Sequence, residues 1–262
     1  MIVTRCLLRT LQSTTPNLMM KTKFAIHSLI LSSLLMATAP AATLSVNLTR
    51  SGAPTETGFT NWESDDGDLP LNLVTTLGTD SITLSAPSTG ISNATTLRSI
   101  DRGGNDGYAG TLPSLTQTWW GQRASSTGAG GFITIDIAGL SAGSYSFTGW
   151  FLDHEDQTGG MKIEFSDNDG VSFTDATSTF DLEAVVADGA TAPIVQNFNF
   201  TATGTSDVQI RFTNVNVDDP DGMNSSGAFA LVNGFEIAVV PEPSSLALVG
   251  LASGLFVLRR RR

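Results

Sequence analysis

Two adjacent tryptophans, Trp119 and Trp120, are the residues of this sequence best suited to binding a sugar. Neighbouring side chains of an extended chain point to opposite faces, so we expect one ring to enter the core and the other to be exposed. An exposed ring offers a flat face for stacking, and Tyr108 and Arg102 in the preceding segment add hydrogen-bonding groups. The alternative is that both rings only cover the edge of a core, where large aromatic side chains usually lie.

Clusters of aspartate are candidates for binding calcium. Ca²⁺ takes roughly six to eight oxygen ligands, and several aspartates in one loop can supply some of them. We expect a structural calcium ion, if one binds, at Asp218, Asp219 and Asp221, and smaller clusters occur within residues 65–68 and 167–169. No cluster matches the EF-hand loop, and aspartate is equally common in turns, so turn formation is the alternative for each of them.

Little in the sequence points to catalysis. His154 is the sole histidine after residue 41. Its neighbour Asp153 would point to the opposite face of a strand and could not orient it as a general base. The single cysteine, Cys6, precedes the folded part of the chain, so no cysteine nucleophile is available there. Carboxylates are too numerous for a glycosidase pair to be singled out. We therefore expect that the protein is not an enzyme.

The charge balance excludes nucleic acid as a partner. The sequence has 14 Lys+Arg and 25 Asp+Glu, a formal net charge of −11. Most basic residues lie near the two ends, so residues 42–240 retain six basic and 24 acidic side chains. A body this acidic would repel phosphate backbones.

Residues 42–239 have the alternation of polar and apolar side chains that predicts an all-β domain. Turn signals containing Gly, Asp and Pro separate short strands, and no segment has a sustained helical period. The strands that we expect cover residues 44–49, 71–77, 81–86, 132–137, 145–151, 196–203, 208–212 and 228–239, and two short strands at residues 163–165 and 171–173 are expected to form a hairpin. This pattern favours a single jelly-roll β-sandwich in which the first and last strands pair.

Residues 1–41 are predicted to be a secretory signal peptide. Two lysines precede an apolar run over residues 24–36, and small residues follow that permit cleavage after Ala41. The residues before the lysines are polar, and we expect translation to start at Met19 or Met20.

The last segment, residues 240–262, has three parts in order: a Pro-Glu-Pro motif, an apolar run over 246–258 and a basic end. The motif and the basic end consist of Pro241, Glu242, Pro243, Arg259, Arg260, Arg261 and Arg262. The run would form a helix of about 20 Å, short for a hydrocarbon core of about 30 Å, so a transient membrane anchor is expected. The arginines should remain in the cytoplasm.

These three parts resemble the PEP-CTERM sorting signal of Gram-negative bacteria that make exopolysaccharide. The resemblance implies a partner, the membrane enzyme exosortase, which recognises and cleaves near the Pro-Glu-Pro motif. It also implies a precursor anchored in the inner membrane, followed by release to the cell surface or the extracellular matrix. The same tail occurs at the carboxyl end of ice-binding proteins, but this match covers only about the last 23 residues and implies nothing about the body.

Two segments of the body, AFALVNGFEI and GLSAGSYSFTGWFLDHE, resemble parts of galactose-binding-like and malectin-like jelly rolls, which include carbohydrate-binding modules. The resemblance implies that the body binds polysaccharide, with exopolysaccharide as the expected ligand. The first alternative is a structural or adhesive matrix protein with no defined ligand. The second is a glycan-degrading enzyme, against which the scarcity of histidine weighs.

Overall fold

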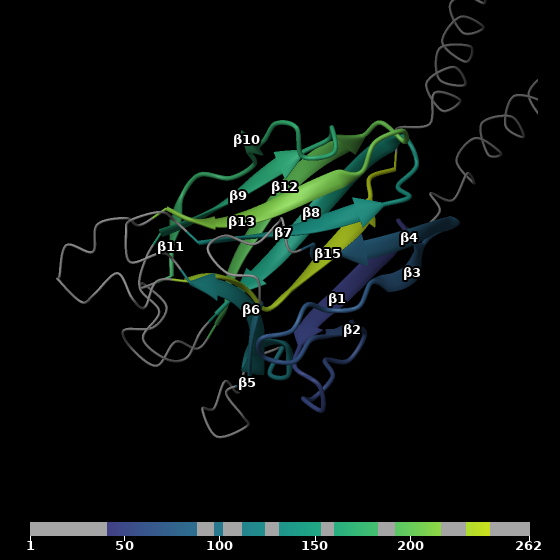
Figure 1. The fold of residues 1–262 in the computed structure, drawn as a ribbon. Coiled ribbons are helices and arrows are strands. Elements are labelled where there is room, and N and C mark those ends of the chain that lie inside the picture. The colour runs from purple at the N-terminus through teal and green to yellow at the C-terminus, as the bar shows by residue number, and fades with distance from the viewer. Residues whose placement is uncertain are drawn as a thin grey trace, which may run out of the picture. The chain divides into compact units, whose positions relative to one another are not determined.

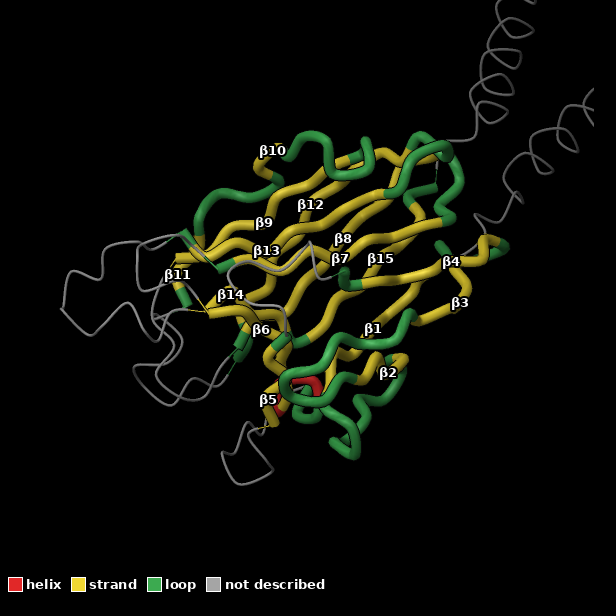
Figure 2. The backbone as a smooth tube through the Cα atoms, in the orientation of Figure 1, coloured by secondary structure: helices red, strands yellow, loops and turns green. Residues whose placement is uncertain are grey.

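The computed structural model describes residues 41–87, 97–101, 112–123, 131–152, 160–182, 192–215 and 229–241. The predicted signal peptide, with the exception of Ala41, and the predicted tail helix lie outside these residues. Within the described part of the chain, no helix has the length and apolar character needed to cross a bilayer. Residues 41–240 form one compact unit, and strands joined by loops make up nearly all the regular secondary structure of its described part (Figures 1 and 2).

Two large sheets make up most of this unit. The first has the order β12-β8-β15-β1-β2, and its neighbours are antiparallel except for the parallel pair β1–β2. Its strands are β1 (Thr43–Thr49), β2 (Thr60–Glu63), β8 (Gly143–Phe151), β12 (Ile194–Ala202) and β15 (Gly234–Val239). The second has the order β10-β9-β13-β7-β4-β3, with β11 also pairing with β9. Its strands are β3 (Leu73–Leu77), β4 (Asp80–Ser85), β7 (Phe132–Ala138), β9 (Gly160–Ser166), β10 (Thr174–Asp175), β11 (Phe180–Asp181) and β13 (Val208–Asn214).

A third, smaller sheet has the order β14-β6-β5. It consists of β5 (Arg98–Asp101), β6 (Thr118–Arg123) and β14 (Phe229–Val232), and a short 3-10 helix, η2 (Leu115–Gln117), precedes β6.

The winding of the chain is that of a jelly roll. Along β7, β8, β9, β12, β13 and β15, each strand lies in the opposite large sheet from the strand before it. The first strand, β1, pairs antiparallel with the last, β15, with Thr43 opposite Ala238. The all-β jelly-roll sandwich expected from the sequence is therefore confirmed.

Aromatic side chains join the two large sheets. Phe147 on β8 lies 6.2 Å from Phe212 on β13, measured between ring centroids, and Phe165 on β9 lies 5.2 Å from Phe200 on β12. Phe147 and Phe212 are almost completely buried. Removing a buried aromatic ring of this kind costs about 3–5 kcal/mol, so these rings contribute strongly to holding the sheets together.

The closing segment, expected to be one strand over residues 228–239, is two strands in two different sheets. β14 ends at Val232 in the third sheet, and β15 begins at Gly234 in the first. The residue between them is Asn233, which is completely buried. Periodicity could not predict this break, because the residues on both sides of Asn233 are apolar and buried.

The side chain of Asn233 connects three parts of the sandwich. Its Nδ2 donates to the carbonyl oxygens of Thr118 (2.8 Å) and Leu152 (3.0 Å), and its Oδ1 accepts from the N–H of Leu152 (2.6 Å). Its backbone N–H donates to the Trp150 carbonyl (3.0 Å), and its carbonyl accepts from the Leu48 N–H (2.9 Å). One buried residue therefore satisfies backbone groups at the end of β8 and the start of β6, and bonds to β1.

Replacing Asn233 should destabilise the fold. In Asn233→Ala, three buried backbone groups lose their partners, and each unpaired group costs roughly 1–3 kcal/mol. We expect the free energy of unfolding to fall by about 3 kcal/mol or more in urea denaturation of the full chain. Asn197→Ala is the matched control, because Asn197 is exposed on β12, and its effect should stay within about 0.5 kcal/mol. Equal stabilities of the two variants would contradict this role of Asn233.

Candidate functional site

Trp119 and Trp120 both lie inside the protein, with exposed fractions of 1% and 0%. Trp120 packs against Trp62 at 4.9 Å between ring centroids, and its Nε1 donates to the Thr49 carbonyl (3.1 Å). The ring of Trp119 occupies the space beside Gly121, where a Cβ atom would collide with it. The prediction that one ring is exposed is wrong, because these residues belong to β6, a central strand covered on both faces, and not to a loop.

Most other predicted site residues lie outside the described part of the chain. They are Tyr108, Arg102, Asp218, Asp219, Asp221, Glu242, Pro243, Arg259, Arg260, Arg261 and Arg262. The described residues contain no group of three or more His, Cys, Asp or Glu side chains that could hold a metal ion. In the smaller aspartate clusters, Asp66 accepts from Arg98 Nε (2.8 Å), and Asp169 accepts from the Asp207 N–H (2.7 Å). Calcium binding at residues 218–221 remains a prediction.

The outward side chains of the first sheet form a surface that we call the polar face. It comprises Thr43 and Ser45 of β1, Ser144, Ser146, Thr148 and Trp150 of β8, Val195, Asn197, Asn199 and Thr201 of β12, and Glu236 and Ala238 of β15. All of them are exposed or partly exposed. Glu236 is the single charged member, so this face is nearly uncharged although the body as a whole is strongly acidic.

Strand register sets the polar face out as rows of hydroxyl and amide groups. Thr148 lies opposite Asn197 and donates from Oγ1 to its Oδ1 (2.7 Å). Glu236 accepts a hydrogen bond from Ser45 Oγ (3.0 Å) through its Oε2. Rows repeat about every 6.8 Å along the strands and about 4.8 Å across them. The face therefore presents a regular array of hydrogen-bond donors and acceptors.

Apolar side chains mark one end of the polar face. Trp150 makes an edge-to-face contact with Phe59 at 5.5 Å between ring centroids, and both rings are partly exposed. Val195, opposite Trp150 on β12, is 45% exposed. These three side chains give a patch suited to stacking, next to the polar rows.

The segment before β2 and the helix η2 cover the first sheet beyond this patch. The carboxylate of Glu56 accepts from the backbone N–H groups of Ser114 (3.0 Å) and Leu115 (3.2 Å), which ties the two segments together. Leu115 in turn lies over Gly234, where a Cβ atom would collide with it. The patch therefore lies at the boundary between the covered and the open parts of the sheet.

Trp150 is a candidate residue that the sequence analysis did not single out. A signal was present, since Tyr145, Phe147 and Phe151 lie on one face of the strand expected over residues 145–151. On a strand containing Phe147 and Phe151, a residue at position 150 must point to the opposite side. Extending the same alternation would have placed Trp150 on the outer face.

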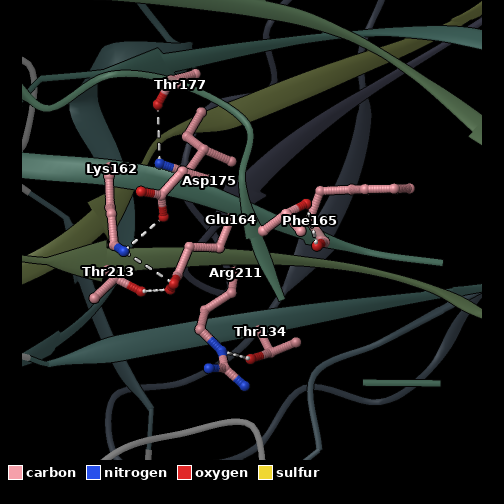
Figure 3. Close-up of polar contacts among 10 residues, drawn as sticks. Thr134, Lys162, Glu164, Phe165, Asp175, Thr177, Arg211 and Thr213 are labelled. Carbon is pink, nitrogen blue, oxygen red and sulfur yellow. Dashed lines mark hydrogen bonds and ion pairs between the residues drawn. The ribbon is translucent and has the colours of Figure 1, made fainter. Parts of the chain in front are cut away.

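The outer face of the second sheet is charged (Figure 3). Lys162 Nζ pairs with Asp175 (2.7 Å) and Glu164 (3.0 Å), and Glu164 accepts from Thr213 Oγ1 (2.6 Å). The hydrogen bond to Asp175 raises the pKa of Lys162. Lys162 therefore stays charged at neutral pH, and the two sheets have outer faces of different chemistry.

Asp136 lies on β7 in the same outer face, and its surroundings disfavour the ionised form of its carboxyl group. Burial, followed by the negative charge of Asp207, raises its pKa from the usual 3.8 to about 6, against a lowering effect of the hydrogen bond to Ser85. Its Oδ1 is buried and has no hydrogen-bond partner among the described residues. Ionised Asp136 therefore destabilises the folded state.

Asp136→Asn should stabilise the protein at neutral pH. A carboxyl group with a higher pKa in the folded than in the unfolded state contributes stability below about pH 4, and this contribution is lost as the pH rises through about 6. We expect the Tm of Asp136→Asn to exceed that of the parent by about 2–4 °C at pH 7.5, a modest value because the group is partly exposed. The difference should vanish near pH 3.5. Asp207→Asn should give a smaller shift, and a difference that does not depend on pH would contradict the assignment.

Comparison with known proteins identifies the tail. Residues 239–262 match the PEP-CTERM protein-sorting motif, as the sequence indicated. No curated protein matches the chain.

Solved structures similar to this chain are distant from it. One is the plant receptor-like kinase ANX2, with 13% identity and a TM-score of 0.42 over 78% of this chain and 54% of that one, about half its length. Another is a family 35 carbohydrate-binding module from Clostridium thermocellum, with 18% identity and a TM-score of 0.31 over 54% and 88%. A third is the CBM22-1 xylan-binding domain of Xyn10C from Paenibacillus barcinonensis, with 10% identity and a TM-score of 0.37 over 68% and 99%. The chain thus carries a PEP-CTERM sorting motif directly after an all-β sandwich.

Proposed function

We propose that this protein is exported, sorted through its PEP-CTERM motif, and binds polysaccharide through the polar face. The observation that carries the proposal is the nearly uncharged array of hydroxyl and amide groups that ends at the partly exposed ring of Trp150. Sugar hydroxyls exchange hydrogen bonds with such groups without the cost of removing a charge from water. Trp150 supplies the flat apolar surface, and the polar rows give orientation and specificity.

The position of the motif is consistent with a body that is folded when the tail is processed. The N–H of Val240 donates to the Ser144 carbonyl (2.9 Å), so backbone pairing continues to the residue before Pro241. Processing by an exosortase near Pro241 would then release the sandwich with β15 intact. The proposed course is an inner-membrane-anchored precursor, followed by a protein of the cell surface or extracellular matrix that contacts exopolysaccharide.

Replacing Trp150 should weaken retention of the protein by neutral polysaccharide. Stacking on an aromatic side chain is worth about 1–3 kcal/mol in nucleic-acid proteins, which corresponds to a loss of roughly 5- to 150-fold in affinity. We expect Trp150→Ala to show a loss in this range in affinity electrophoresis through gels containing β-glucan, xylan or mannan. Val171→Ala is the control, because Val171 is 84% exposed but lies in the segment between β9 and β10.

A second variant separates binding from folding. Asn197→Asp combined with Asn199→Asp places negative charges on the exposed edge of the polar face without touching the core. It should abolish retention while leaving the Tm unchanged within a few degrees. If Trp150→Ala and the double asparagine variant were both retained like the parent, the polar face would not be the binding site. A parent that none of the polysaccharides retains would favour the alternative of a matrix protein with no defined ligand.

A further inference from the structure

We infer that Arg211, on the outer face of the second sheet, binds the carboxylate of an acidic sugar in a polysaccharide. This site lies on a different sheet from the polar face and does not depend on it. The inference follows from how the guanidinium is held, from the partner that it lacks and from the charge around it.

Two aromatic rings and a threonine hold the guanidinium of Arg211. Its Cζ lies 3.5 Å from the ring centroid of Phe173 and 4.8 Å from that of Phe132, and its Nε donates to Thr134 Oγ1 (3.4 Å). Stacking on aromatic faces and a hydrogen bond at Nε fix the plane of the group. The terminal N–H groups of the guanidinium are therefore oriented before a ligand arrives, which lowers the entropic cost of binding.

Arg211 is hydrogen-bonded to no carboxylate of the described residues, although the negative charge of Glu164 acts on it. Glu164 lies opposite it in the strand register, but its two oxygens are engaged by Lys162 and Thr213. In Figure 3 the only dashed line from Arg211 runs to Thr134, and none joins its two terminal nitrogens to the other labelled side chains. An arginine that aromatic rings hold in one orientation, with no hydrogen bond to a carboxylate of the described residues, is suited to a carboxylate supplied by a ligand.

The geometry of the Arg211 guanidinium favours a carboxylate as the ligand group. Two parallel N–H groups of a guanidinium match the two oxygens of a planar carboxylate, and such bidentate pairs are among the strongest hydrogen bonds in proteins. Burial lowers the pKa of Arg211, but the group remains charged at neutral pH. Partial burial also reduces the screening of this interaction by solvent.

The acidic charge of residues 42–240 limits which kind of polymer can carry this carboxylate to Arg211. With six basic and 24 acidic residues, residues 42–240 repel polyanions and acidic proteins, including a second copy of this chain. A polysaccharide with isolated acidic sugars in a neutral backbone avoids most of this repulsion. Uronic acids spaced along a neutral chain are therefore the ligand class that fits Arg211.

A matched pair of probes tests this inference. The first is a xylotetraose with one glucuronic acid side group, and the second is the same molecule with the carboxyl reduced to an alcohol. The affinities are measured by isothermal titration calorimetry with the full chain in mild detergent. The parent should bind the acid probe at least about 10-fold more tightly than the reduced probe, and this ratio of the two affinities is the quantity compared between variants. Arg211→Lys, which keeps the charge but loses the fork, and Arg211→Gln should each reduce this ratio to about 1.

The ratio of the two affinities distinguishes ligand binding from a purely structural role, which would lower the Tm of the variants and leave the ratio unchanged. Arg98→Gln is the matched control, because Arg98 is an exposed arginine of the third sheet that pairs with Asp66. This variant should keep the ratio of the two affinities. Trp150→Ala should also keep the ratio, so failure of the polar face and failure of Arg211 give different results. Equal binding of the two probes by the parent, a ratio preserved in Arg211→Gln, or tighter binding of a glutamate-containing peptide than of the acid probe would overturn the inference.

Discussion

The buried side chain of Asn233 is the constraint on which the remainder of the structure depends. It lies where the chain leaves the third sheet and enters the first, and its amide satisfies backbone groups of Thr118 and Leu152. Because its backbone also bonds to Trp150 and Leu48, the ends of β8, β6 and β1 are held at one point. The ring of Trp150 owes its place at the end of the polar face to this junction.

The winding of the jelly roll gives the protein two outer faces of different chemistry. Strand alternation sends Ser, Thr and Asn of β8 and β12 outward on the first sheet, and Lys162, Glu164 and Arg211 outward on the second. A nearly neutral face suits neutral sugar rings, whereas an oriented guanidinium suits a carboxylate. A protein with both would connect neutral and acidic parts of a matrix polysaccharide, which agrees with the proposed location after sorting.

Local alternation predicted much of this fold. It predicted strands over residues 145–151 and 208–212 and indicated the all-β class, because each strand of a sandwich has one covered face. The same rule failed at Trp119 and Trp120, because β5 and β14 flank β6 and neighbouring segments cover both of its faces. The surroundings of Arg211 could not be predicted either, since Phe132 and Thr134 reach it through the pairing of β7 with β13, and Phe173 reaches it from the segment before β10. The sorting motif was found completely, because it is a contiguous segment.

Hydroxyl-radical footprinting of the full chain tests the central claim most directly, because it reports the exposure of individual side chains. The account predicts that a neutral polysaccharide reduces the oxidation of Trp150 and Phe59, which are partly exposed at the end of the polar face. Oxidation of Phe173, on the other face of the sandwich, should remain unchanged. Protection of Phe173 without protection of Trp150, or no protection of either ring by a polysaccharide that retains the protein, would contradict the account.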